Sequence, residues 1–262
     1  MTKKSVLPSK PESYPIPPLD ELTMLVFGQP GTGKTTFCSK AKDTMFFATE
    51  PGTDFITAAV KKVYTWEDFI EALDELEELK ESITKGERKK TDWLYKSFVI
   101  DIVDNLANQC RTSVCAKKGL AYPPTNDFGK TWSEITDTWK KNLRRLMILG
   151  NVRFISHCTS QEVETTNEQG LTESITRYVP TFFGSKTAQY LDGIVNLQGY
   201  CAVNKKGEYC ITFKQQAAVS AKDRTGLLAE YGALHLEWDI VNAAYEAKAK
   251  ELGKTILSRR SF

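Results

Sequence analysis

The sequence lacks the long hydrophobic runs of membrane proteins and the cysteine spacing of most zinc proteins. No uninterrupted apolar run approaches the ~20 residues that a membrane-spanning helix needs. No apolar segment follows the two lysines near the N-terminus, so a secretory signal is not expected. The six cysteines include no C-x-x-C pair, a pattern typical of packed thiols rather than of disulfides or zinc ligands. We therefore expect a soluble cytoplasmic protein without a membrane partner.

An excess of one charge is also missing, because 35 basic and 33 acidic residues leave a net charge of only +2. Bulk charge gives no argument for a nucleic-acid partner, so any such argument must rest on local segments. The 262 residues suffice for one sizeable α/β domain. Five prolines among polar residues favour an extended N-terminal arm over residues 1–20. A single domain over residues 21–262, including a C-terminal helix, is expected to follow.

Apolar runs that predict strands alternate with amphipathic segments that predict helices. The expected strands cover residues 22–27, 44–48, 97–101, 152–156 and 193–197, and the expected helices cover residues 34–42, 66–84, 104–118, 131–149 and 238–252. Residues 200–203 and 208–213 flank a turn sequence and predict a hairpin. The predicted fold class is α/β, with a mainly parallel sheet flanked by helices and a C-terminal antiparallel hairpin. Ligands of such sheets bind at the carboxyl ends of the strands.

A phosphate-binding loop is the strongest motif in the chain. Residues 28–35 match G-x-x-x-x-G-K-[ST] in full, between a predicted strand and a predicted helix. The glycines let successive backbone N–H groups face an anion, Lys34 would reach the β- and γ-phosphate oxygens, and the Thr35 hydroxyl would ligate magnesium. We therefore expect ATP and Mg²⁺ as cofactors. The expected nucleotide-binding residues are Gly28, Gln29, Pro30, Gly31, Thr32, Gly33, Lys34, Thr35 and Thr36.

Acidic residues follow the predicted strands beside this loop. Asp101 closes the strand at 97–101 and is expected to bind magnesium together with Thr35. Asp104 either shares that task or caps the following helix. Glu50 follows the strand at 44–48 and is expected to act as the general base that activates water. A solvated residue of a Pro-Gly turn is the alternative interpretation of Glu50.

The order of these motifs resembles the RecA family of ATPases, in its core-only phage form that acts in recombination or single-strand annealing. The resemblance covers residues 22–232 and implies a RecA-like P-loop NTPase core with Glu50 as the catalytic base. The family's γ-phosphate sensor is usually glutamine, and here its position holds His157. A hydrogen-bonded structural histidine is the other interpretation of His157.

The same resemblance implies two segments that contact single-stranded DNA. The longer is a mobile loop over residues 158–187, whose latter half carries rings suited to stacking on bases and cations suited to phosphates. Its DNA-binding candidates are Arg177, Tyr178, Phe182, Phe183 and Lys186. The shorter segment, residues 119–130, offers Tyr122, Phe128 and Lys130. Aromatic side chains that cover the edge of the core are the alternative for both segments.

A basic pair in the C-terminal part resembles the cations with which RecA relatives reach the ATP of a neighbouring subunit. Lys222 and Arg224 have the family's K-x-R spacing. A cation supplied in trans stabilises charge on the transferring phosphoryl group, so the resemblance implies a homo-oligomer, either a ring or a filament. A surface ion pair that involves Asp223 is the alternative.

The function that these motifs predict is ATP binding and hydrolysis, stimulated by single-stranded DNA, in annealing or strand exchange during phage-type recombination. A single-strand-binding or annealing protein is the candidate for a further partner. A small-molecule P-loop kinase would share the phosphate loop, although the sequence offers no arginine-rich lid. An adaptor that uses ATP as an assembly switch, without productive turnover, is the third hypothesis.

Overall fold

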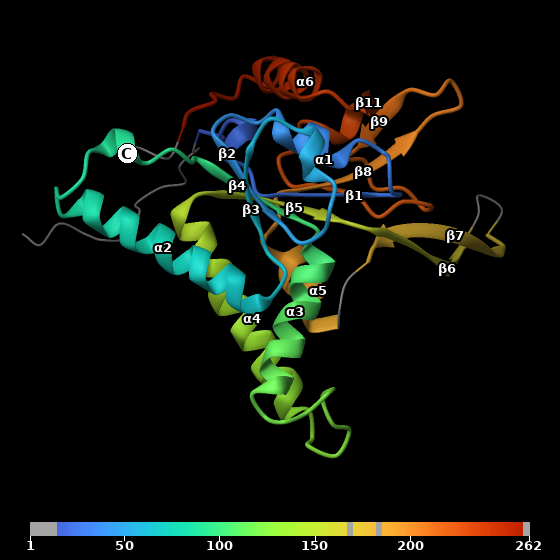
Figure 1. Cartoon of the computed structure of the whole chain (residues 1–262). Helices are drawn as coiled ribbons and strands as arrows, with labels where there is room; N and C mark the ends of the chain where they lie inside the picture. The colour runs from blue at the N-terminus through green and yellow to red at the C-terminus, as the bar shows by residue number, and fades with distance from the viewer. Residues whose placement is uncertain (1–14, 167–169, 182–184, 259–262) are drawn as a thin grey trace, which may run out of the picture.

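The computed structural model describes residues 15–166, 170–181 and 185–258. Within these ranges a nine-stranded sheet has the order β11-β9-β8-β1-β5-β4-β2-β3, and β10 pairs with β8 (Figure 1). Its strands are β1 (Met24–Gly28), β2 (Thr44–Ala48), β3 (Ala59–Lys62), β4 (Ser97–Asp101), β5 (Asn151–Ser156), β8 (Leu197–Val203), β9 (Tyr209–Thr212), β10 (Lys222–Asp223) and β11 (Ala233–His235). The six strands from β8 to β3 pair in parallel, whereas β9, β10 and β11 pair antiparallel. The predicted mainly parallel sheet with a C-terminal hairpin is confirmed.

Helices cover both faces of the sheet (Figure 1). The helices are α1 (Lys34–Ser39), α2 (Trp66–Thr84), α3 (Val103–Ala116), α4 (Lys130–Leu149), α5 (Ser185–Ile194) and α6 (Trp238–Glu251). One apolar cluster joins α2, α3, α4 and α5 to one face, and a second joins α1 and α6 to the other. None of the helices in the described ranges combines the length and the apolar character that a bilayer crossing requires.

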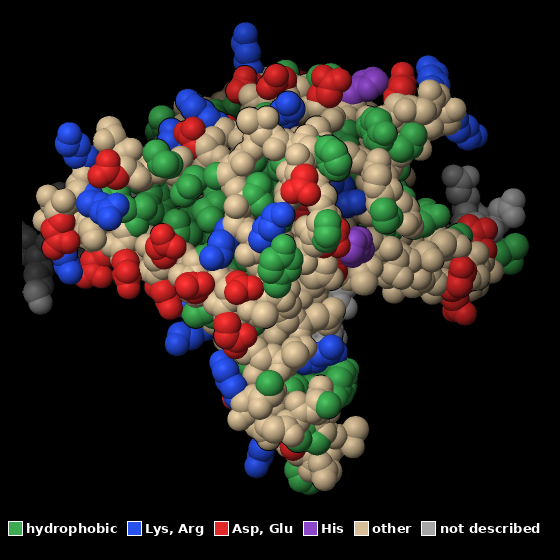
Figure 2. Space-filling model, in the orientation of Figure 1, with side chains coloured by type: hydrophobic (Ala, Val, Ile, Leu, Met, Phe, Trp, Pro, Cys, Tyr) green, Lys and Arg blue, Asp and Glu red, His purple; other side chains and the backbone are tan. Residues whose placement is uncertain are grey.

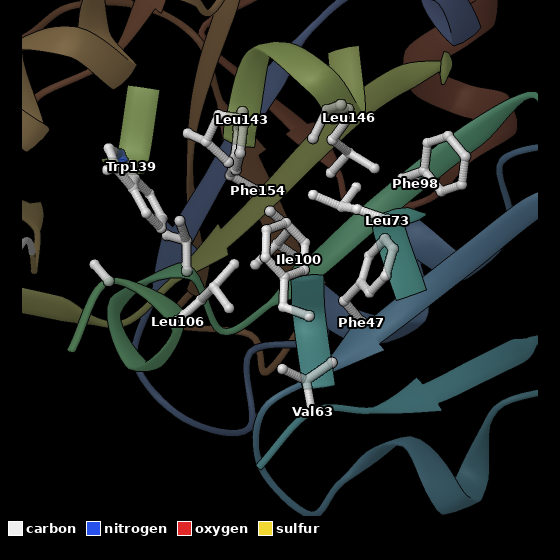
Figure 3. Packing of buried hydrophobic residues seen from close by; sticks show 14 of the residues in the cluster. Phe47, Val63, Leu73, Phe98, Ile100, Leu106, Trp139, Leu143, Leu146 and Phe154 are labelled. Atoms are coloured by element: carbon white, nitrogen blue, oxygen red, sulfur yellow. The ribbon is translucent and has the colours of Figure 1, made fainter. Parts of the chain in front are cut away.

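The spacing of apolar residues explains which face of each helix is buried. In α2, Phe69, Leu73 and Leu76 recur at three- and four-residue steps, and all three are buried against the sheet. Figure 3 shows Leu73 beside Phe47 and Phe98 of the strands. Burial of a side chain of this size stabilises the fold by about 1.5–3 kcal/mol. The helices therefore hold the strands, and with them the strand ends, in a fixed register.

The predicted strand over residues 193–197 is wrong. The first part of this segment completes α5, which ends at Ile194, and β8 begins at Leu197 and continues through the residues assigned to the hairpin. Leu191 and Val195 are both fully buried in the cluster below the sheet. A short apolar run fits a helix end as well as a strand, and packing decided between them.

The predicted mobile loop over residues 158–187 is also wrong, because most of it forms a hairpin of β6 (Cys158–Thr166) and β7 (Thr172–Pro180). The strands pair antiparallel along their whole length and project from the sheet (Figure 1). The β7 backbone at Tyr178 also exchanges hydrogen bonds with Ala218 and Ser220, and its ring stacks on Tyr200 at 5.6 Å. A two-stranded ribbon is marginal alone, so these contacts at its base stabilise it.

Of the expected extended arm over residues 1–20, residues 1–14 lie outside the described residues, and the last part packs against the domain. Leu19 is fully buried in the cluster that contains α6. Ile16 forms a β-bridge with Ile256, and the Tyr245 hydroxyl donates a hydrogen bond to the Pro17 carbonyl at 2.8 Å. The prolines keep this segment extended, and its two apolar side chains attach it to the domain.

Candidate active site

The phosphate loop lies between the end of β1 and the first turn of α1, as the motif predicts. Gly31 and Gly33 have φ of 76° and 82°, a region that side-chain-bearing residues rarely adopt. At Gly28 a Cβ atom would lie 2.2 Å from the Cys201 carbonyl oxygen on the neighbouring strand. Glycine is therefore required at Gly28 for a close approach of two strands and at the other two positions for the turn.

Lys34 is buried within this loop. Its Nζ donates hydrogen bonds to the carbonyl oxygens of Gly28 at 2.9 Å and Gln29 at 2.8 Å, and lies 3.4 Å from the Thr32 hydroxyl. Burial lowers the pKa of Lys34, and the nearby Asp101 and Glu50 carboxylates act in the opposite direction. An ammonium group has three donor hydrogens, so binding an anion would require Lys34 to exchange at least one of these partners.

Thr35 and Asp101 meet although they are 66 residues apart in sequence. The Thr35 hydroxyl donates a hydrogen bond to Asp101 Oδ2 at 2.8 Å. Burial raises the pKa of Asp101 to about 6, and the hydrogen bond from Thr35 partly opposes this shift. A hydroxyl and a carboxylate are the hard oxygen donors that Mg²⁺ accepts from proteins, so this donor pair fits the expected ion.

Glu50 faces the same cleft from the end of β2. Asn105 Nδ2 donates a hydrogen bond to Glu50 Oε2 at 3.2 Å, and His157 Nε2 lies 3.7 Å from the same oxygen. The Thr49 hydroxyl accepts a hydrogen bond from the Ile102 backbone N–H at 2.9 Å and donates one to its carbonyl at 3.0 Å. Thr49 thus ties the end of β2 to the end of β4 and keeps Glu50 beside Asp101.

Among the described residues no hydrogen bond joins Asp104 to Thr35, and the N-cap residue of α3 is Ile102, which has no side-chain cap. Its carboxylate accepts hydrogen bonds from the Ser156 hydroxyl at 3.0 Å and from the His157 backbone N–H at 2.9 Å. His157 Nδ1 lies 4.0 Å from the same carboxylate. Burial raises the pKa of Asp104 to about 6. Asp104 thus positions His157 through these contacts. Neither of the two roles expected for Asp104 included this one.

A cleft of about 520 Å³ opens over the phosphate loop, within the size range of small-molecule sites. Lys34, Thr35, Glu50 and His157 line it, as the sequence predicts. Its apolar wall comes from residues that the motifs missed: Phe55, Ile56, Tyr209 and Leu236. These residues lie after β2, in β9 and after β11, and no local sequence signal connects them with the phosphate loop. Their common wall follows from the sheet order, which places the hairpin beside β1.

The predicted cations Lys222 and Arg224 do not join this cleft within the chain. Lys222 lies in β10 and Arg224 directly follows it. β10 pairs with the beginning of β8, whereas the phosphate loop lies at the far end of the adjacent β1. Lys222 Nζ forms an ion pair with Asp192 at 2.8 Å, and Arg224 Nη1 donates a hydrogen bond to the Gly193 carbonyl at 2.8 Å. Both cations thus pack against the end of α5.

The nucleic-acid candidates within residues 158–187 are spread over two elements. Arg177 and Tyr178 lie near the base of the β6–β7 hairpin, and both are half-buried. Lys186 is exposed on α5. Phe182 and Phe183 lie outside the described residues. Arg177, Tyr178 and Lys186 therefore do not form one continuous loop.

The fold and the phosphate site together define a P-loop NTPase with a RecA-like core. The AAA domain family matches residues 20–225, and the chain belongs to this family. A solved structure of the ATPase domain of another protein is similar to 87% of this chain and 84% of its own, with 12% sequence identity and a TM-score of 0.42. No curated protein matches the chain. No group of three or more His, Cys, Asp or Glu that could hold a metal ion occurs in the described part of the chain.

Proposed function

We propose that the protein binds ATP with Mg²⁺ in the cleft over the phosphate loop and hydrolyses it. The observation that carries this proposal is the hydrogen bond between Thr35 and Asp101, which brings two magnesium-type donors together beside Lys34. Mg²⁺ usually takes only one or two protein carboxylates and completes its shell with phosphate oxygens and water. When bound, the ion would neutralise charge on the phosphates.

The neighbouring residues fit a hydrolytic site. Glu50 has one carboxylate oxygen engaged by Asn105, which leaves the other oxygen free of that bond to accept a proton from water. Lys34 supplies positive charge at the phosphate loop. The His157 ring lies between the Glu50 and Asp104 carboxylates, so a change in its hydrogen bonding would alter the surroundings of both. Water is therefore the acceptor that we propose.

We further propose that hydrolysis is stimulated by single-stranded DNA and supports strand annealing or exchange in phage-type recombination. The support is the resemblance of the motif order to RecA relatives, together with the exposed cation Lys186 and the rings near the hairpin base. Lys222 and Arg224 lie far from their own cleft, as a pair acting on a neighbouring subunit would. The proposed active form is a homo-oligomer, either a ring or a filament.

The test is release of inorganic phosphate from ATP with and without single-stranded DNA, alongside sizing by light scattering. We expect magnesium-dependent phosphate release that rises with DNA, and a larger particle with ATP. Arg224→Ala mixed with Lys34→Ala should regain part of the lost activity if Arg224 acts across subunits. Transfer of phosphate to a metabolite would favour a kinase. Tight ATP binding without phosphate release would favour an adaptor.

A further inference from the structure

Five basic side chains lie along α4 and the adjoining α5. Residues three or four positions apart on a helix are neighbours, so Arg144 lies beside both Lys140 and Lys141. We call the set the α4–α5 stripe. Its members are Lys130, Lys140, Lys141, Arg144 and Lys186. Lys130 to Arg144 spans roughly 21 Å at 1.5 Å per residue, the length of several nucleotides.

Tyr190 joins the α4 and α5 parts of the stripe. Lys140 Nζ lies 5.7 Å and Arg144 Cζ lies 5.9 Å from the centroid of the Tyr190 ring. Lys186 precedes Tyr190 by one turn on α5 and shares its face of the helix. The ring of α5 therefore holds two cations of α4 in one place by cation–π attraction, and Lys186 lies on the same helix face as the ring.

None of the five cations of the stripe forms an ion pair with a described carboxylate. No carboxylate among the described residues lies within 4.0 Å of any of its five cations. Of the acidic residues exposed on the same side of α4, Glu134 pairs with Lys118, and Asp137 has no such partner in the described ranges. By contrast, Arg145 of the same helix pairs with Asp74 and Glu77 of α2. The stripe thus keeps a local positive charge in a chain of nearly neutral composition.

One end of the stripe carries an exposed ring. Phe128 is 98% exposed, and it lines a groove of about 530 Å³ at the start of α4. The charged residues of this groove are Lys130 and Lys141 with Glu134 and Asp137. Unpaired bases stack on such rings while their phosphates bind neighbouring cations. A ring next to a row of cations therefore fits a single strand better than a duplex, whose bases are already stacked.

We infer that the α4–α5 stripe binds single-stranded nucleic acid, with phosphates on its cations and a base on Phe128. This inference rests on the proposed function for the class of partner and places the contact on α4 and α5. It joins Phe128 and Lys130 from one predicted segment to Lys186 from the other through Lys140, Lys141 and Arg144, for which the sequence suggested no role.

The test compares Lys140→Gln/Arg144→Gln with wild type, using fluorescence anisotropy of labelled oligothymidylate over a series of salt concentrations. We expect affinity to fall at least tenfold and the slope of log K against log salt to lose about 1.4, because each lost phosphate contact contributes about 0.7. Lys89→Gln/Lys90→Gln removes two exposed lysines elsewhere and should change neither. Unchanged ATP binding and circular dichroism show that the variant is folded.

The outcomes separate this inference from the proposed function. If wild type binds oligothymidylate and the double variant binds it with the same affinity and slope, the stripe is not the site, although the DNA partner stands. If wild type does not bind oligothymidylate under any of these conditions, both the stripe and the proposed DNA partner are overturned, whereas the proposed ATP hydrolysis is not affected. If the double variant instead loses self-association without nucleic acid, the stripe is an interface between copies and the inference is overturned. Asp137→Asn should tighten binding, and an unchanged or weaker affinity would count against the stripe.

Discussion

The nucleotide cleft and the α4–α5 stripe hold charge in opposite ways. In the cleft, Lys34 and Asp101 are buried, and each forms at least one hydrogen bond. On the stripe, Lys141 and Arg144 are exposed and have no described carboxylate within 4.0 Å. Burial strengthens electrostatic interactions and makes their loss costly, whereas exposed charges are screened by salt. Single substitutions should therefore have large effects in the cleft and small, additive ones on the stripe.

A third region contrasts with both. The exposed face of α2 carries a row of carboxylates, visible below the centre-left of Figure 2. Two of them, Asp74 and Glu77, are engaged by Arg145 of α4. The other members exposed on this face are Glu67 and Glu71, which pair with Lys117 and Lys61, and Glu75 and Glu78. This face would repel a nucleic-acid backbone, so the two sides of the helical layer are not equivalent for such a partner.

The largest effect is expected for Glu50→Gln. The amide keeps the size of the side chain but cannot take a proton, so phosphate release at saturating ATP should fall by roughly 10²–10⁴-fold. ATP affinity measured by calorimetry should change little. Asn105→Ala, which removes only the group that orients Glu50, should have a smaller effect on the rate. Full activity of Glu50→Gln would remove Glu50 from the chemistry and favour the adaptor hypothesis.

The next largest effect is expected for Lys34→Ala. Hydrogen bonds to charged groups contribute roughly 1.5–3 kcal/mol, so ATP affinity should fall by at least tenfold in calorimetry. Lys40→Ala changes an exposed lysine just past the end of the same helix and serves as the matched control. Equal ATP affinities of the two variants would show that the loop lysine does not contact the nucleotide.

Asp101→Asn should change how stability depends on pH. The pKa of Asp101 is raised to about 6 from its ordinary value of 3.8, so the folded protein binds more protons than the unfolded chain between these values. Its contribution to stability is full below about pH 4 and is lost as the pH rises through about 6. Without nucleotide or magnesium, the variant should gain on the order of 1–3 kcal/mol relative to wild type between pH 4 and pH 7.

Urea unfolding at several pH values measures this difference, with Asp54→Asn as an exposed control. A variant whose stability runs parallel to wild type across this range would show that Asp101 is not buried in its charged form. The same ionisation should govern the ligand, because a protonated carboxyl is a poor magnesium donor. Binding of ATP with magnesium should therefore weaken as the pH falls below about 6 in wild type.

The smallest effects are expected for single substitutions on the stripe. Lys141→Gln and Lys130→Gln should each lower the salt slope of oligothymidylate binding by about 0.7, and their effects should add because both side chains are exposed. Fluorescence anisotropy again provides the measurement. Strongly non-additive effects in the double variant would show that the cations of the stripe depend on one another, as the buried groups of the cleft do.

Several parts of the site could be predicted from sequence because their signals are local. The phosphate loop depends on glycines and a lysine within eight consecutive residues, and Asp101 closes a recognisable buried strand. The meeting of Thr35 with Asp101 follows once the sheet is parallel, since carboxyl ends of neighbouring strands converge. His157 reaches the cleft for the same reason, at the end of β5.

Other parts depend on contacts between distant residues. The β6–β7 hairpin has a polar sequence typical of a loop, and cross-strand pairing with contacts at its base made it a ribbon. The sequence left two roles open for Asp104, magnesium binding and helix capping. Its actual partner Ser156 is 52 residues away. Tyr209 and Leu236 line the cleft only because β9 and β11 continue the sheet beside β8.

The sequence by itself determined the α/β class, the phosphate loop and the acidic strand ends, because periodicity and turn chemistry act over a few residues. Only the tertiary structure decided the wall of the cleft, the contacts of Asp104 with His157 and the separation of Lys222 and Arg224 from their own cleft. It also assembled the α4–α5 stripe, which depends on Tyr190 of one helix lying under cations of another. Such contacts arise from the packing of helices and strands into layers, and no short segment of the chain encodes them.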